Sequence, residues 1–172
     1  FIDDMPSLFL SYGVISVRDT GGLIDKLEPV IEVMRAPDAL APRVFFSGPL
    51  LDGKFVVYDG GLVPEIGTQN ATVEMANEKI EILKNAGVDF IKIYEMVTPE
   101  VFTALTDAAT KFKLPVAAHI PLSMTASLAG PKVDSMEHLR NVELDCAINS
   151  ATLYEERLSR LNSHTEGAGL TL

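Results

Sequence analysis

Short apolar runs rich in β-branched residues alternate along the chain with amphipathic helical patterns, and this alternation restricts the fold more than any other feature. Five runs have the length of a buried strand, at residues 14–17, 44–46, 90–93, 116–118 and 133–136. A helix between two strands of one sheet forms a right-handed crossover that makes the strands parallel. The sequence therefore predicts an α/β fold with a parallel sheet. The sheet is part of a longer barrel, is an open doubly wound sheet, or covers its edges by self-association.

The helical patterns between the strands have recognisable ends. The clearest runs from Thr98 to Phe112, with its apolar residues on one face, Thr98 as the N-cap and Pro99 at the first helical position. A second pattern runs from about residue 72 to residue 85, and Gly87 is placed to close it. Shorter helices are predicted at residues 27–34, 123–129 and 149–161.

The stretch from Pro49 to Asn70 interrupts this rhythm. It contains Asp52-Gly53 and Asp59-Gly60-Gly61 on either side of an alternating run at residues 54–58, which predicts a hairpin inside a loop between a strand and a helix. Such loops lie above the carboxyl ends of parallel strands, where α/β proteins hold their sites. We expect this stretch either to shape a pocket or to form a surface excursion.

Length and charge narrow the class of protein. The 172 residues, 47% of them hydrophobic, suit a single domain with a sizeable core, and no apolar run approaches the roughly 20 residues of a membrane span. A net charge of -10 argues against a nucleic-acid partner, which would need a basic surface. The single cysteine, Cys146, excludes an intrachain disulfide. We expect neither a nucleic-acid nor a membrane partner, and the compartment stays open with the cytoplasm favoured.

Three chemically notable residues lie in or at the ends of the predicted strands. Lys92 lies within Asp-Phe-Ile-Lys-Ile-Tyr, where burial of an unpaired charge is costly. It is therefore either a functional group or a strand-end lysine that reaches water or pairs with Glu95. His119 and His138 close the next two strands, whose ends converge on one face of a parallel sheet. This spacing favours shared binding of a metal ion.

Other polar residues near these strand ends have two possible roles each. Tyr94 and Arg140 lie just past the presumed ligands and could contact a substrate carboxylate, or be solvated loop residues. Arg18 and Asp19 follow the first strand and could point into a pocket, although an arginine–aspartate pair that holds the following turn is the preferred interpretation. Glu137 should face away from its neighbouring histidine if the strand alternates, as a structural or ligand-supporting group.

Five segments of the chain resemble the amidohydrolase superfamily, in the branch of imidazolonepropionase and the metal-dependent Xaa-Pro dipeptidases (prolidases). They are GVISVRDTGG (13–22), PRVFFSGPL (42–50), GVDFIKIY (87–94), VAAH (116–119) and VDSMEH (133–138). The resemblance implies a (β/α)8 TIM barrel in which the five strands are the second through sixth. Residues 1–172 would then form a single partial barrel domain of about five βα units, without the first strand and the last two.

The resemblance also implies a metal site. Lys92 matches a fourth-strand lysine that the family carboxylates to a carbamate bridging two divalent metals, and His119 and His138 match histidines that bind the second metal. Zinc is the expected ion, with two in the complete site. The implied activity is hydrolysis of an amide or peptide-like C–N bond by a metal-held hydroxide, with a dipeptide or cyclic amide as the small-molecule substrate.

The family's pattern also has parts that fall outside these residues. Its first-strand His-x-His pair would precede Phe1, and its eighth-strand aspartate, which is both metal ligand and general base, would follow Leu172. We therefore assign no catalytic base within the chain and do not expect the chain alone to turn over substrate.

Two other functions fit the same residues. A lysine within a buried strand can also be the nucleophile of a Schiff-base aldolase, although that chemistry does not require the paired histidines. Alternatively, the chain is a non-catalytic, incomplete barrel that covers its unpaired strand edges by forming a homo-oligomer.

Overall fold

The computed structural model describes residues 4–163, so the first and last residues of the predicted 1–172 domain lie outside it. The elements in chain order are α1 (Met5–Ser11), β1 (Ser16–Asp19), α2 (Ile24–Arg35), β2 (Arg43–Phe46), β3 (Leu50–Asp52), β4 (Gly67–Gln69), α3 (Val73–Asn85), β5 (Ile91–Ile93), α4 (Pro99–Phe112), β6 (Val116–Ala118), α5 (Ala126–Ala129), η1 (Gly130–Lys132), β7 (Ser135–Met136), η2 (Glu137–Leu139), α6 (Glu143–Cys146) and α7 (Ser150–Asn162).

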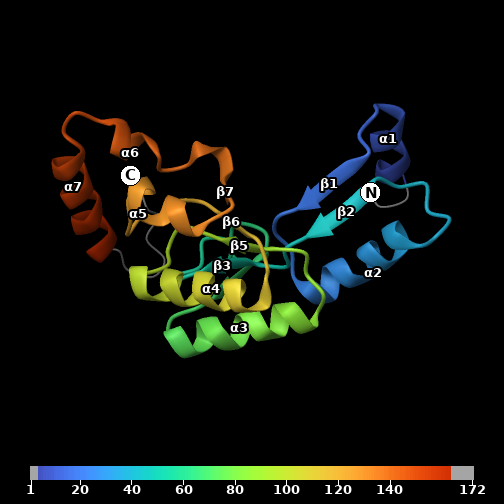
Figure 1. Cartoon of the computed structure of the whole chain (residues 1–172), viewed down its shortest axis with the longest axis horizontal. Coiled ribbons are helices and arrows are strands. Elements are labelled where there is room, and N and C mark those ends of the chain that lie inside the picture. Colours follow the sequence, from blue (N-terminus) through green and yellow to red (C-terminus); the bar gives the residue numbers. More distant parts are fainter. Residues whose placement is uncertain (1–3, 164–172) are drawn as a thin grey trace.

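The named strands pair in parallel throughout, which confirms the predicted α/β class. β1 pairs with β2, and a second sheet has the order β4-β3-β5-β6-β7. In Figure 1, β1 and β2 form an arm with α1 and α2, whereas β3, β5 and β6 lie over α3 and α4 in the body. The helices predicted at residues 72–85 and 98–112 are α3 and α4, and the shorter helices α2, α5 and α7 also form where expected, with shifted ends.

Backbone hydrogen bonds join the two sheets where the chain bends between β2 and β3. Gly48 has φ +73°, in the left-handed region that glycine adopts without strain. On either side of this bend, the Ser47 N–H donates to the carbonyl of Asp19 at 3.1 Å, and the Gly22 N–H donates to the carbonyl of Gly48 at 3.1 Å. The strand predicted at residues 44–46 is β2, and β3, which the sequence analysis did not predict, follows it after the bend.

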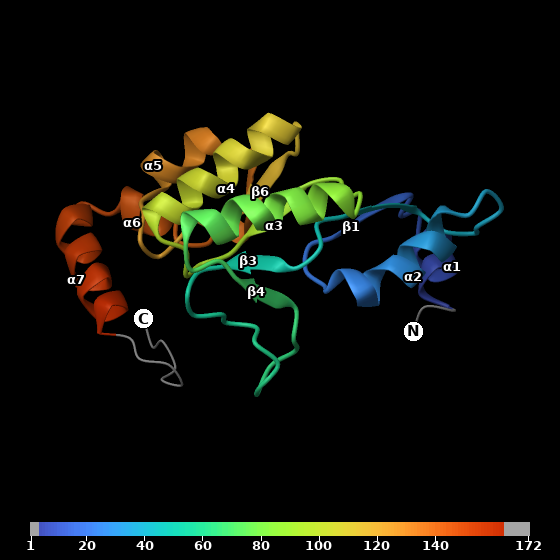
Figure 2. The same cartoon turned by 90° about the horizontal axis from the view of Figure 1, so that it is seen from below.

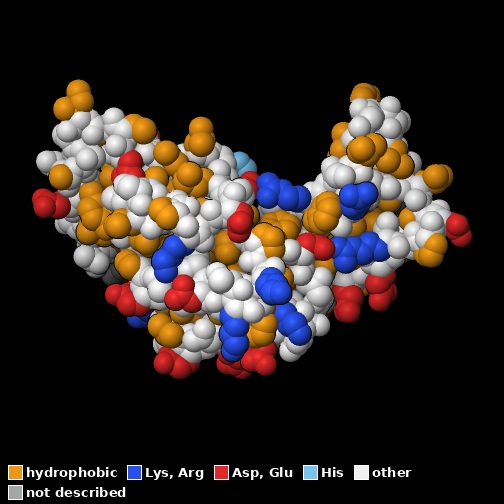
Figure 3. All heavy atoms as spheres, viewed as in Figure 1, with side chains coloured by type: hydrophobic (Ala, Val, Ile, Leu, Met, Phe, Trp, Pro, Cys, Tyr) orange, Lys and Arg blue, Asp and Glu red, His pale blue; other side chains and the backbone are white. Residues whose placement is uncertain are grey.

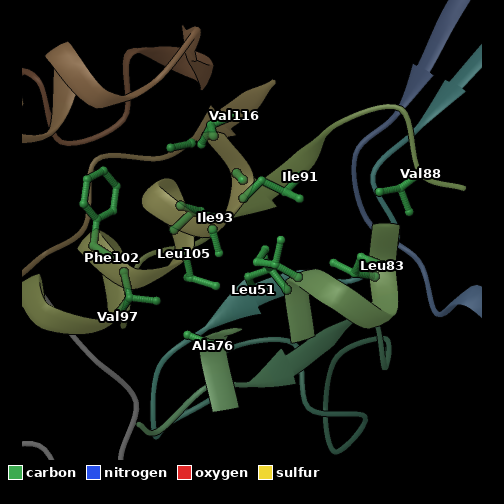
Figure 4. Packing of buried hydrophobic residues seen from close by; sticks show 14 of the residues in the cluster. Leu51, Ala76, Leu83, Val88, Ile91, Ile93, Val97, Phe102, Leu105 and Val116 are labelled. Atoms are coloured by element: carbon green, nitrogen blue, oxygen red, sulfur yellow. The ribbon is translucent and has the colours of Figure 1, made fainter. Parts of the chain in front are cut away.

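The core lies between the strands of the body and the two helices that cover them. The strands β3, β5 and β6 have three residues each, and every one of these residues is buried. Figure 4 shows Leu51, Ile91 and Ile93 of the strands facing side chains of α3 and α4. The face of α4 predicted to be apolar supplies Val101, Phe102, Leu105, Ala108 and Ala109, all buried. Burying one such large side chain contributes about 2 kcal/mol, so this face fixes α4 against the sheet.

The hairpin predicted in the stretch after Pro49 is reduced to one antiparallel bridge, and the predicted strand at residues 54–58 is wrong. β3 and β4 are parallel, with Leu51 opposite Thr68, and residues 54–58 form no strand. The antiparallel element described there is a single bridge between Asp59 and Glu65. In place of a strand pairing, the Val57 N–H donates to the carboxylate of Asp52 at 2.9 Å, a local side-chain bond that competes with strand formation.

No helix in the described part of the chain combines the length and the apolar character required to cross a bilayer.

Candidate functional site

The carboxyl ends of β5, β6 and β7 bring the predicted site residues together. Lys92 lies within β5 opposite Ala117 of β6, and His119 follows β6 directly. The rings of His119 and His138 meet edge to face, with centroids 5.3 Å apart. Figure 3 shows histidine atoms, with acidic and basic side chains, at the rim of the hollow between the body and the arm. The predicted convergence of strand ends therefore places these three side chains in one region.

Lys92 is a buried lysine that lies near charged side chains without bonding to them. Its side chain is buried, and Nζ has no hydrogen-bond partner among the described residues. Burial lowers the pKa of Lys92 to about 8, although the carboxylates of Glu137 and Glu95 oppose the shift. The alternative in which Lys92 pairs with Glu95 is wrong, because other groups occupy that carboxylate. Lys92 is still mainly protonated near physiological pH, but its neutral form, in which an amine is nucleophilic, is more populated than in an ordinary lysine.

Glu95 organises the site, and the sequence analysis gave it only the role of a possible partner of Lys92. Its Oε1 accepts hydrogen bonds from Nδ1 of His119 and from Nε of Arg140, both at 2.8 Å. Burial raises the pKa of Glu95, but these two hydrogen bonds outweigh burial and hold it below its usual value. Because an ionised carboxylate only accepts, His119 must carry its proton on Nδ1, which leaves Nε2 for a ligand. A charge directly after a buried strand is the signal that could have revealed this role.

His119 has the surroundings that metal-binding histidines commonly have. Its Nδ1 bonds to a buried carboxylate, an arrangement that fixes the ring and its tautomer. Burial lowers the pKa of His119, and the hydrogen bond from its ring to Glu95 opposes this only in part. The neutral imidazole, which is the form that binds metals, is therefore favoured.

A row of aromatic rings continues from the histidines to the loop after β3. The Tyr94 ring lies 4.6 Å from that of His119, centroid to centroid, and Tyr58 meets Tyr94 edge to face at 5.7 Å. Burial, followed by the nearby Glu95 carboxylate, raises the pKa of Tyr94 above its usual value. Its hydroxyl therefore stays protonated and can donate a hydrogen bond at neutral pH.

His138 does not end a strand as predicted, because the chain turns sharply after β7. His138 lies in η2 with φ +58°, and Leu139 and Asn141 also have positive φ values, of 52° and 64°. Residues other than glycine adopt this region at a cost, and such strain is concentrated at functional sites. Asn141 holds the turn by donating from Nδ2 to the carbonyl of Ile120 at 2.7 Å. The turn presents His138 and Arg140 beside Glu95 and His119.

Arg18 reaches across the molecule instead of pairing with Asp19, so the predicted pair is wrong. Its Nη2 donates to both carboxylate oxygens of Glu137, at 3.1 and 3.2 Å. Asp19 accepts the Gly21 N–H at 3.1 Å, so it does hold the turn after β1, by itself. The Arg18–Glu137 pair links the arm to the turn after β7, and its two charges act on Lys92.

Asp52, at the end of β3, is a buried carboxylate that the sequence analysis assigned only to a turn. It accepts three backbone N–H groups, from Gly53 at 3.1 Å, Val57 at 2.9 Å and Met96 at 2.7 Å. Burial nevertheless raises the pKa of Asp52 to about 6. The hydrogen bond from Met96 joins the end of β3 to the loop after β5, at the residue that follows Glu95 in the sequence.

These residues fit one part of a metal centre. The described residues contain no group of three His, Cys, Asp or Glu side chains that could hold a metal ion. Two neighbouring imidazoles and the unpartnered amine of Lys92 are the donors that the site offers. Zinc in proteins commonly has four ligands, so this set is chemically suitable but incomplete.

Comparison with known proteins shows similarity to amidohydrolases and prolidases. No protein-family model matches the sequence. A bottromycin amidohydrolase has a TM-score of 0.67 and 25% identity over 92% of this chain and 34% of its own. A prolidase solved with N-methylphosphonate-L-proline gives 0.62 and 22% over 89% of this chain and 43% of its own. A Xaa-Pro dipeptidase solved with bound methionine gives 0.58 and 19%, covering 81% and 41%.

The matches have two consequences. The chain has the α/β fold of part of an amidohydrolase TIM barrel, which confirms the resemblance seen in the sequence motifs. It spans 34 to 43% of the length of these three proteins.

Proposed function

We propose that the chain carries part of the metal and substrate site of a hydrolase that cleaves an amide or peptide-like C–N bond in a dipeptide or cyclic amide. The observation that carries the proposal is the arrangement around Lys92, a buried amine with no hydrogen-bond partner within residues 4–163. Beside it lies His119, whose Nδ1 bonds to Glu95 and whose ring contacts His138. The structural similarity to amidohydrolases and prolidases supports the reaction class.

Each residue has a part in this proposal. Lys92, His119 and His138 would hold the metal, and zinc, when bound, supplies a Lewis acid that activates water and polarises an amide carbonyl. The lowered pKa of Lys92 favours the free amine, which adds carbon dioxide to form a carbamate and releases a proton. Tyr94 donates from its phenol, and the half-exposed Arg140 supplies positive charge for a substrate carboxylate.

Zinc binding at equilibrium tests the proposal without requiring turnover. We expect the chain, dialysed against micromolar zinc, to take up about one ion, and His119→Ala and His138→Ala variants to take up much less. His164→Ala, the remaining histidine of the chain, is the matched control and should bind as the parent does. No uptake by the parent chain, or equal uptake by all four proteins, contradicts the proposed ligands.

A second candidate function rests on Lys92 alone. A buried amine with a pKa of about 8 and no hydrogen-bond partner among the described residues also suits a Schiff-base lysine. The amine would condense with a carbonyl compound to an imine with loss of water, and borohydride would reduce that imine to a stable secondary amine. Treatment with pyruvate and borohydride tests this. A mass increase located at Lys92 favours the aldolase over the metal site, and an unmodified Lys92 rules the aldolase out.

A further inference from the structure

We propose that Tyr58 is a specificity-determining residue, which extends the site with an aromatic wall and selects amide substrates that carry an aromatic side chain. This inference rests on the proposed function, because it names the substrate class of the same site. It starts from the loop between β3 and β4, a segment with no role in the proposed metal site.

The loop is anchored at its base on both sides of Tyr58. Before it, the Val57 N–H donates to Oδ2 of Asp52 at 2.9 Å. After it, the carbonyl of Tyr58 accepts the N–H groups of Gly67 at 3.0 Å and Ile66 at 3.3 Å. The backbone of Tyr58 is thus tied to the ends of two strands, so its ring has a defined position.

Close packing at the start of β4 supports this anchoring. A Cβ atom added to Gly67 would lie 2.6 Å from the Val56 side chain and 3.1 Å from the Tyr58 carbonyl oxygen. The loop therefore lies directly against β4 at this point. Beyond the anchored base the loop projects away from the sheet (Figure 2), and Leu62 at its tip is fully exposed. The anchored base, and not the tip, carries the tyrosine.

The ring of Tyr58 is the outer end of a continuous row. From Tyr58 the contacts pass to Tyr94, then to His119 and then to His138, with centroid separations of 5.7, 4.6 and 5.3 Å. Such rings prefer edge-to-face or offset neighbours, and a further ring can join them in either geometry. Tyr58 and Tyr94 are both partly exposed, so a bound ring can reach them.

Positive charge beside the row indicates what else the substrate carries. Arg140 is about half exposed and donates to Glu95 next to Tyr94. A ligand with an aromatic ring and a carboxylate could therefore contact the tyrosines and the guanidinium together. N-acetyl-L-phenylalanine has both groups and an amide bond, and N-acetyl-L-alanine differs from it only in lacking the ring.

The two compounds are the probes for the test, in nuclear magnetic resonance titrations of the metal-free chain. We expect the parent to bind the phenylalanine derivative about fivefold more tightly than the alanine derivative, the contribution of one aromatic contact. Tyr58→Ala and Tyr58→Leu should lose most of this preference, and Tyr58→Phe should keep it. Tyr12→Ala, which removes a tyrosine that is 79% exposed on the arm, is the matched control and should also keep it.

Two outcomes overturn the inference. One is a parent chain that binds both probes equally or binds neither. The other is a preference that survives in Tyr58→Ala and Tyr58→Leu, because selection would then come from other rings. The leucine variant retains apolar volume, so it keeps the test valid if the alanine variant fails to fold. Because the titration uses no metal, failure here leaves the zinc result untouched, and failure to bind zinc leaves this result untouched.

Discussion

Asp52 is held in a position where its charge is disfavoured, and this gives a pH dependence of stability. Burial raises its pKa in the folded chain to about 6, above the 3.8 expected when it is unfolded. The folded state therefore binds this proton more tightly, and the contribution of Asp52 to stability increases as pH falls from about 7 to about 4. The gain is about 3 kcal/mol at most, and chemical denaturation across this range measures it.

Two variants separate Asp52 from the other acidic residues. Asp52→Asn cannot titrate, so the part of the pH dependence that belongs to Asp52 should disappear. Asp38→Asn, at an exposed position, should retain the parent's profile. If the difference in stability between the parent and Asp52→Asn does not change between pH 7 and pH 4, the assignment to Asp52 is wrong.

Position 53 requires glycine because the backbone of Met96 passes close to its Cα atom. Substitution by alanine, which adds one methyl group, tests this requirement. A Cβ atom at this position would lie 1.9 Å from the carbonyl oxygen of Met96, a rigid backbone atom. We expect Gly53→Ala to lower the free energy of unfolding by about 3 kcal/mol. Gly61→Ala is the control, because its Cβ would lie 3.3 Å from its nearest neighbour, an exposed Asp59 oxygen. Similar unfolding energies for the two variants would show that the contact with Met96 relaxes easily.

At the scale of the element, α4 depends on the residue that begins it. The Thr98 hydroxyl accepts the Val101 N–H at 3.3 Å, and Pro99 occupies the next position. Thr98→Ala leaves that N–H without its partner and should cost about 1 kcal/mol of stability. Thr98→Ser keeps the hydroxyl and should remain close to the parent. Thermal unfolding distinguishes the two, and equal losses in both variants would argue against a capping role.

At the scale of the whole molecule, the strands at the edges of the two sheets have an unpaired side. In the described residues β1 has a strand neighbour on one side only, and apolar residues of the same arm are exposed, including Ile15 at 73%. Free parallel edges favour association with another chain. We expect concentration-dependent self-association in analytical ultracentrifugation, which Ile15→Lys weakens.

Leu62→Lys provides the comparison for this prediction, because it places the same charge on another exposed apolar residue, in the loop between β3 and β4 and away from the edge of β1. It should associate as the parent does. A parent chain that is monomeric at all concentrations contradicts the prediction, as does equal weakening by both substitutions.

The local periodicities of the sequence determined the fold class, the main helices and the general location of the site. Buried strands and capped amphipathic helices are set by side chains within a few residues of one another, so α3 and α4 could be predicted nearly to the residue. The positions of Lys92, His119 and His138 near the ends of parallel strands follow from the same pattern. The role of these three residues as metal ligands stays a prediction.

Only the tertiary structure decided which side chains meet. Glu95 binds His119 and Arg140 in place of Lys92, Arg18 crosses to Glu137, and Asp52 accepts the backbone N–H of Val57. These contacts join residues from different elements, and each carboxylate had several possible partners in the sequence. The choice among them depends on distances and burial that exist only when the strands are assembled, and local sequence patterns do not encode such distances.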